Sequence, residues 1–340
     1  MTEQTPRFHE SNLWSTPIRD LGLTIEGTRL EPILEEFQDE LRQAGITRVH
    51  PRLYLSTEWG VPFETVAIAI PFYLAHPDLT ALHAERVGHI EGFDRNDILR
   101  YLRHEMGHVI NYAYRLYDDE EWVKQFGSIT QPYFEEYKPE PFSRRYVRHL
   151  PGWYAQKHPD EDWAETFAVW MTPGLDWRGE YGAWPVASAK LAYCNRTMAS
   201  LRDRDPQVTS TELDEDVGDI EYSLDHYYGK VAAGWGDLPP GLDGALRAIF
   251  DDLAGTGNNH PLKPASDLIR RVEPELMANV FRWTGHFPER TRVLLRYLAE
   301  RASRLGQGYP ANREDSAIMA LTTLVTGLAM NHVQRGSYLP

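Results

Sequence analysis

Residues 101–110 read Tyr-Leu-Arg-His-Glu-Met-Gly-His-Val-Ile, and positions 104–108 form the pattern His-Glu-x-x-His. Residues four positions apart lie on the same face of an α-helix, so His104 and His108 can offer two imidazole nitrogens to one metal ion. Glu105 follows the first histidine, where a hydrolytic metal site needs a general base to activate water. This stretch therefore predicts a helix that carries a catalytic metal.

The residues around this pattern support a helix. Apolar side chains recur every three or four positions, at Ile98, Leu102, Met106, Val109, Ala113 and Leu116. Asp94 or Asn96 can cap the start of the helix. The alternative is an amphipathic helix that carries two surface histidines and a glutamate by chance.

A catalytic zinc site needs a third protein ligand, and a second stretch downstream supplies candidates. Residues 158–170 read His-Pro-Asp-Glu-Asp-Trp-Ala-Glu-Thr-Phe-Ala-Val-Trp, in which Pro159 and the acids after it mark the start of a helix. Glu165 lies among apolar or small neighbours, so we expect a buried carboxylate, which needs a partner or a metal. A helix whose acids face water explains Asp160 and Glu161 but explains Glu165 poorly.

Taken together, the two motifs resemble the glutamate-type zincin metallopeptidases, and most of all the bacterial zinc-binding metallopeptidase families, over about residues 45–195. The resemblance implies one zinc ion per chain on His104, His108 and Glu165, with Glu105 as the general base. The chain departs from the short-spaced, thermolysin-like members, because Glu165 follows His108 by 57 positions and Val169 stands where those enzymes have an Asp. We therefore expect Asp162, one turn before Glu165, to orient a histidine. Glu161 and Asp162 are the alternative third ligands.

The order of elements predicts an α+β fold. A helix that ends near Gly45 is followed by two strand-like runs, over residues 47–56 and 65–74, and then by the metal helix. By resemblance, a sheet edge lies along the cleft, and residues 66–70 can pair with an extended substrate there; an interior strand is the alternative. We expect a zincin-like domain with a small mixed sheet over residues 1–200 and a mainly helical domain over residues 201–340.

A hydrolytic zinc site also needs a donor for the oxyanion that develops in the reaction. Tyrosines and a histidine from later segments are the candidates, namely Tyr193, His226, Tyr227 and Tyr228. Residues 117–157 connect the two ligand helices and are rich in aromatic side chains. A connection of this length either forms a wall of the cleft or packs its aromatics as core. The last third predicts five helices, over residues 219–232, 242–254, 265–283, 288–305 and 313–334.

The composition of the chain limits the kinds of partner and the compartment that we expect. A net charge of −15 argues against nucleic acid, and the single cysteine, Cys194, excludes a disulfide within the chain and fits the cytoplasm. The N-terminus lacks the basic and apolar regions of a signal peptide. The most apolar run, residues 318–330, is interrupted by threonines and is shorter than the ~20 residues that span a bilayer, so we expect no membrane partner.

We therefore expect a zinc-dependent metallopeptidase that acts on a peptide or protein substrate. The alternative is a zinc-dependent amide hydrolase, or an enzyme dedicated to processing one modified peptide in a biosynthetic pathway. A third possibility is a binding protein with a structural metal or none. Glu105 argues against it, because a structural site has no use for a base beside its ligands, and closed structural sites favour cysteine.

Overall fold

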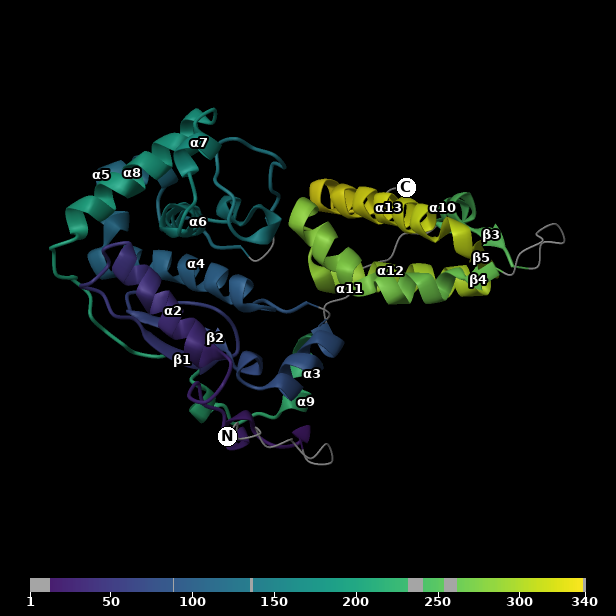
Figure 1. The fold of residues 1–340 in the computed structure, drawn as a ribbon, viewed down its shortest axis with the longest axis horizontal. Coiled ribbons are helices and arrows are strands. Elements are labelled where there is room, and N and C mark those ends of the chain that lie inside the picture. The colour runs from purple at the N-terminus through teal and green to yellow at the C-terminus, as the bar shows by residue number, and fades with distance from the viewer. Residues whose placement is uncertain (1–12, 88, 135–136, 232–240, 254–261, 339–340) are drawn as a thin grey trace. The chain divides into compact units, whose positions relative to one another are not determined.

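We describe a computed structural model of the protein, which covers residues 13–87, 89–134, 137–231, 241–253 and 262–338 (Figure 1). The chain forms two compact units, one from residues 1–86 and 90–231 and the other from residues 87–89 and 232–340. The division comes later than the expected boundary after residue 200, because the following segment packs on the first unit. The Val66 amide donates to the Ser210 carbonyl at 2.7 Å, and the Tyr54 hydroxyl donates to the Asp214 carbonyl at 2.9 Å.

Helices dominate both units, with 60% of residues helical and two small sheets, which fits the expected α+β class. The first unit contains α2 (Leu30–Gln43), β1 (Arg52–Ser56), β2 (Ala67–Pro71), α3 (Pro77–Val87), α4 (Arg95–Tyr114), α5 (Glu120–Phe126), α6 (Pro159–Met171), α7 (Trp177–Tyr181), α8 (Pro185–Leu201) and α9 (Leu224–Val231). Cys194, on α8, is a buried core residue.

The sheet of the first unit places β2 in its interior. β1 pairs with β2 in parallel, and Gly60 pairs with Ala69 of β2 in an antiparallel bridge. All five residues of β2 are buried. Of the two alternatives for residues 66–70, the structure therefore has the interior strand, and the segment around Gly60 lies outside it.

Helix α4 is held against this unit along its length. Asp94 caps its start by accepting a hydrogen bond from the Asp97 amide at 2.9 Å. Arg103 donates two hydrogen bonds, of 2.7 and 2.6 Å, to the carboxylate of Glu40 on α2. Such a two-pronged, partly buried pair fixes direction as well as distance. The opposite side of α4 faces α6 (Figure 1).

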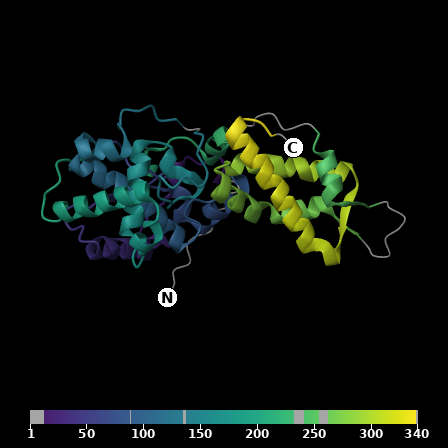
Figure 2. The same cartoon turned by 90° about the horizontal axis from the view of Figure 1, so that it is seen from above.

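The second unit is a helical group with one small sheet (Figure 2). Its elements are α10 (Asp243–Ile249), β3 (Asp251–Asp252), β4 (Leu262–Pro264), α11 (Ala265–Thr284), α12 (Pro288–Arg304), β5 (Gln307–Pro310) and α13 (Glu314–Arg335), with the sheet in the antiparallel order β3-β5-β4. The expected helices agree closely with α11, α12 and α13, whereas α9 and α10 are shorter than expected. Part of each of those two predictions, including residues 232 and 254, lies outside the described residues.

One helix among the described residues, Ala311–Arg335, is long and apolar enough to cross a membrane by length and composition alone. The apolar segment is thus longer than the run of residues 318–330 that we considered, because the helix continues on both sides of that run. Core helices pass the same test, and this one contributes Leu321, Val325 and Leu328 to the core of the second unit.

The second unit also buries a neutral histidine. His286 Nδ1 lies 2.7 Å from the Thr291 hydroxyl, and its Nε2 lies 2.8 Å from the Tyr338 hydroxyl. Burial lowers the pKa of His286 to about 3, and the charges of His332 and Arg290 act in the same direction. His286 is therefore a structural side chain whose protonation opposes folding.

Candidate metal centre

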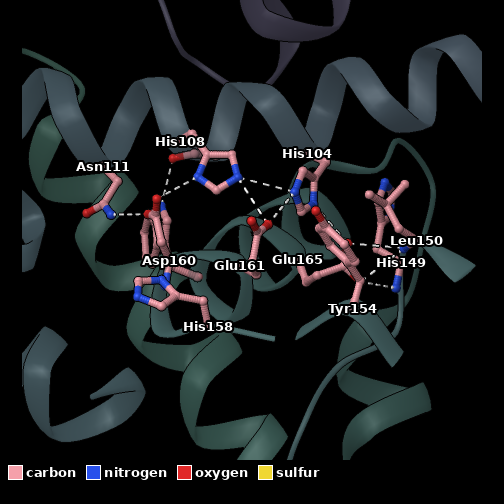
Figure 3. A network of polar contacts seen from close by, with 12 residues as sticks. His104, His108, Asn111, His149, Leu150, Tyr154, His158, Asp160, Glu161 and Glu165 are labelled. Atoms are coloured by element: carbon pink, nitrogen blue, oxygen red, sulfur yellow. Dashed lines mark hydrogen bonds and ion pairs between the residues drawn. The ribbon is translucent and has the colours of Figure 1, made fainter. Parts of the chain in front are cut away.

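Helix α4 brings the two histidines of the first motif together. His104 and His108 are both buried, and their Nε2 atoms lie 3.2 Å apart (Figure 3). Glu105 lies beside them on the same helix and lines the same pocket, with only 5% of its surface exposed. The i, i+4 spacing thus places the imidazoles as the sequence predicts.

Helix α6 crosses α4 at close range because Gly107 has no side chain. A Cβ at position 107 would lie 2.7 Å from the Cα of Ala164, which is too close for any real contact. The Trp163 indole also donates a hydrogen bond to the Gly107 carbonyl at 2.8 Å. The glycine inside His-Glu-x-x-His therefore sets the distance between the two helices, and α6 can place its acids directly beside the histidines.

Glu161 is the acid that α6 places beside both Nε2 atoms. Its Oε2 lies 2.9 Å from His104 Nε2 and 3.3 Å from His108 Nε2 (Figure 3). His104, His108 and Glu161 are the group within the described residues whose donor atoms converge closely enough for one metal ion. This differs from the expected set, in which Glu165 was the third ligand and Glu161 an alternative.

Glu165 instead contacts the opposite nitrogen of His104. Its Oε1 lies 2.9 Å from His104 Nδ1, and its side chain is fully buried. The carboxylate also accepts the backbone amides of His149, at 2.9 Å, and Leu150, at 3.0 and 3.1 Å (Figure 3). A carboxylate in this position orients the ring and fixes which nitrogen faces the metal.

Asp160 has the corresponding place beside His108. Its Oδ2 forms an ion pair with His108 Nδ1 at 3.0 Å. Asn111 donates to Oδ1 at 2.7 Å, and the Tyr112 hydroxyl donates to Oδ2. Helix α6 thus supplies one carboxylate to each Nδ1 and a third carboxylate between the two Nε2 atoms.

Asp162, which we expected to orient a histidine, points elsewhere. It forms a buried ion pair of 2.5 Å with Lys190 of α8. Adjacent residues on a helix point about 100° apart, so the Asp162 side chain does not lie on the face of α6 from which Glu161 reaches α4. Its role is to join α6 to α8.

The charges of the cluster favour a cation. Burial lowers the pKa of His104, but its hydrogen bonds to Glu161 and Glu165 outweigh burial and raise it to about 9. The pKa of His108 is likewise raised well above its ordinary value, because the nearby charges of Asp160 and Glu161 outweigh burial. Buried carboxylates need a positive partner, and a divalent ion can supply it here as well as protons can.

The donor atoms also fit zinc by distance. In a tetrahedral site with zinc–ligand bonds of about 2.0–2.1 Å, neighbouring donor atoms lie about 3.3 Å apart. The three separations here are 3.2, 2.9 and 3.3 Å. Two imidazoles and one carboxylate are the ligand types of hydrolytic zinc sites, which leave a fourth position open.

A pocket of about 360 Å³ opens onto these atoms. Its polar lining includes Glu105, Tyr112, Tyr133, Tyr154 and His158. The Tyr133 hydroxyl donates to Glu161 Oε1 at 2.7 Å, so it holds the oxygen that does not face the histidines. The Tyr154 ring meets the His104 ring edge-on, with centroids 5.5 Å apart (Figure 3).

None of the four expected oxyanion donors lines this pocket. Tyr193 packs against Phe126 and Trp163 in the core, and the Tyr227 hydroxyl donates to the Thr57 carbonyl at 3.2 Å. Tyr228 contacts His83 Nδ1 at 3.2 Å, and His226 packs against Tyr222. Tyr193, Tyr227 and Tyr228 pack within the first unit instead, and His226 is exposed.

Two of the pocket tyrosines, Tyr133 and Tyr154, come from the long connection between the two helices of the site. Tyr154 directly follows Gly152 and Trp153, which both have left-handed backbone conformations, with φ of 82° and 64°. Trp153 is held in this conformation by the Arg148 guanidinium, 3.8 Å from its ring, and by Phe142. Such conformations persist only where the surroundings enforce them. Aromatic enrichment predicts either a wall of the cleft or core packing for this connection, and no sequence signal singles out Tyr154.

Residues 84–183 match the family model described as "Putative zinc-binding metallo-peptidase". The match agrees with the resemblance to zinc-binding metallopeptidase families drawn from the two motifs, without stating the zincin subtype, and it includes both helices of the candidate metal centre. No curated protein and no solved structure matches the chain.

Proposed function

We propose that this protein is a zinc-dependent peptidase whose metal is held by His104, His108 and Glu161. The convergence of their three donor atoms on one point in a pocket is the observation that supports the proposal most strongly. A zinc ion there would supply Lewis-acid chemistry, polarising a substrate carbonyl and making water easier to deprotonate. Asp160 and Glu165 would hold the two rings with Nε2 toward the metal.

Glu105 is the proposed general base. It lines the pocket next to His104, and burial raises the pKa of its carboxyl above the ordinary value. A carboxylate with a raised pKa takes a proton from attacking water more readily and can then deliver it to the leaving amine. A metal that only stabilised the fold would need no such group.

Tyr154 is the proposed donor to the oxyanion. It lines the pocket at the edge of the His104 ring. Burial raises the pKa of its hydroxyl well above the ordinary value, so the hydroxyl keeps its proton and remains a donor. Tyr133 is less suited to this role, because its hydroxyl already donates to Glu161.

The test is cleavage of a mixed set of quenched fluorescent peptides by the zinc-loaded chain and by Glu105→Gln. We expect the wild type to cleave and the variant to lose activity by at least about 10²-fold while it keeps its zinc. Glu120→Gln, an exposed acid on α5, is the matched control and should keep full activity. Cleavage by Glu105→Gln at the wild-type rate would contradict the assignment of the base.

A further inference from the structure

The pocket has one wall of fixed aromatic and apolar side chains. Phe63 is 59% exposed, although Tyr112 and Tyr117 support its ring at centroid distances of 5.0 and 5.7 Å. Trp59 stacks on Tyr101 at 5.3 Å, and its indole donates to the Glu91 carbonyl at 3.2 Å. An exposed aromatic side chain at a pocket marks a place where a ligand buries apolar surface.

The backbone of this wall is also anchored. The Ala69 amide of β2 donates to the Gly60 carbonyl at 2.8 Å, which fixes the segment between Trp59 and Phe63 beside the sheet. Gly60 and Val61 line the pocket in the same segment, and Ile129 adds a further apolar side chain to the lining. The apolar surface is therefore preformed, which lowers the entropy cost of binding a side chain against it.

The charged groups in the lining point to the kind of peptide bond that fits. Glu105, Asp160 and Glu161 are carboxylates, and no arginine or lysine belongs to the described lining. The nearby cation Lys157 lies over the Tyr133 ring, with its ammonium 4.4 Å from the ring centre, and is not part of the lining. A substrate's terminal carboxylate would thus meet like charges, and the lining offers it no arginine or lysine; the proposed zinc would be taken up by the scissile carbonyl.

The pocket also offers no available carboxylate to the free amino terminus of a substrate. Asp160 already binds His108, Asn111 and Tyr112, and Glu161 lies between the two histidines. Glu105 is the remaining carboxylate of the lining, and the proposed chemistry requires it as a base. Recognition of a chain end needs an oppositely charged group that is not otherwise engaged.

Building on the proposed peptidase function, we propose that the site cleaves internal bonds of an extended peptide. A large apolar or aromatic side chain next to the scissile bond packs against Phe63. The pocket excludes both chain ends because its carboxylates are engaged and its described lining offers no arginine or lysine.

The test uses three quenched peptides of equal length with wild type, Phe63→Ala and Phe93→Ala. The first peptide is blocked at both ends and has Phe on both sides of the central bond. The second has Asp in place of these two Phe residues. The third places the Phe pair next to a free carboxyl end. We expect wild type to prefer the first by at least about tenfold in kcat/KM over each of the others. Phe63→Ala should lose most of the preference for Phe over Asp. Phe93→Ala, an exposed aromatic outside the lining, should keep it.

Binding separates this inference from the peptidase proposal itself. Fluorescence polarisation of the labelled, uncleaved peptides on Glu105→Gln measures selection without turnover. Tighter binding of the blocked Phe peptide, weakened by Phe63→Ala, supports the inference even if wild type cleaves nothing, in which case only the proposed function fails. Equal binding of all three peptides, no binding of any, or preferred cleavage at a free end would overturn the inference, with Lys157 the first residue to examine in the last case.

Discussion

Removing Glu165 or Glu161 should have opposite consequences, although both are buried acids on one face of α6. Glu165→Ala removes the acceptor of the buried Leu150 amide and of the part-buried His149 amide. An unsatisfied buried donor costs about 1–3 kcal/mol, so the Leu150 amide alone predicts a loss of about 1–3 kcal/mol in the unfolding free energy of the metal-free chain, and the His149 amide adds to it. Glu161→Ala leaves no backbone amide without an acceptor, because the partners of the Glu161 carboxylate are His104, His108 and the Tyr133 hydroxyl.

Zinc affinity should rank the two variants in the other order. Losing a group that only orients a ligand typically weakens metal binding by about 10–100-fold, and we expect Glu165→Ala to fall in that range. Glu161→Ala removes a ligand and should weaken binding further. Guanidinium unfolding in excess chelator measures the unfolding free energy of the metal-free chain. Competition with a chromophoric chelator measures the zinc affinity of each variant.

Glu120→Ala is the matched control and should change neither quantity. The reasoning fails if Glu165→Ala is as stable as wild type without metal but cannot bind zinc, while Glu161→Ala binds zinc normally. That pattern would make Glu165 the ligand.

Three further predictions concern positions outside this pair. Gly107→Ala should cost about 1–3 kcal/mol and weaken zinc binding, because the new Cβ pushes α6 away at Ala164; an unchanged unfolding curve would contradict this. Tyr154→Phe should lower kcat by about 10²–10³-fold with zinc binding unchanged, whereas Tyr193→Phe should leave kcat intact; equal effects would refute the donor assignment. The pKa of His286 is about 3 in the folded state, below its unfolded value of 6.5. Its contribution to stability is therefore present above pH 6.5 and is lost as the pH falls from 6.5 toward 3. The unfolding free energy should fall by up to about 1.4 kcal/mol per pH unit in this range. His286→Phe should flatten this part of the stability–pH curve, and a slope equal to that of wild type would be inconsistent with it.

The first ligand helix could be predicted because its signal is local. His104, Glu105 and His108 lie within five residues, and helical geometry fixes their relation without knowledge of the rest of the fold. The later helices α11, α12 and α13 were predictable for the same reason, since their apolar periodicity is long and regular.

The choice between Glu161 and Glu165 could not be made from the sequence. They stand four residues apart on one helix face, so periodicity treats them alike. Glu165 was favoured because its neighbours are apolar, and it is indeed the more buried of the two. Its burial reflects the backbone amides of His149 and Leu150, which come from a connection without a regular pattern.

Tyr154 could not be singled out for a related reason. Tyr154 reaches the site through a left-handed turn at Gly152 and Trp153, and such turns are set by tertiary contacts rather than by local propensity. The candidates that were named, such as Tyr227 and Tyr228, are equally polar and aromatic, but they pack elsewhere in the unit.

The most direct test of the central claim is a crystal structure of the zinc-loaded chain with anomalous data at the zinc edge. We expect one peak about 2.0–2.2 Å from His104 Nε2, His108 Nε2 and a Glu161 oxygen, with Glu165 on His104 Nδ1. A peak bound to Glu165 in place of Glu161, or no peak at the two histidines in zinc-soaked crystals, would contradict it.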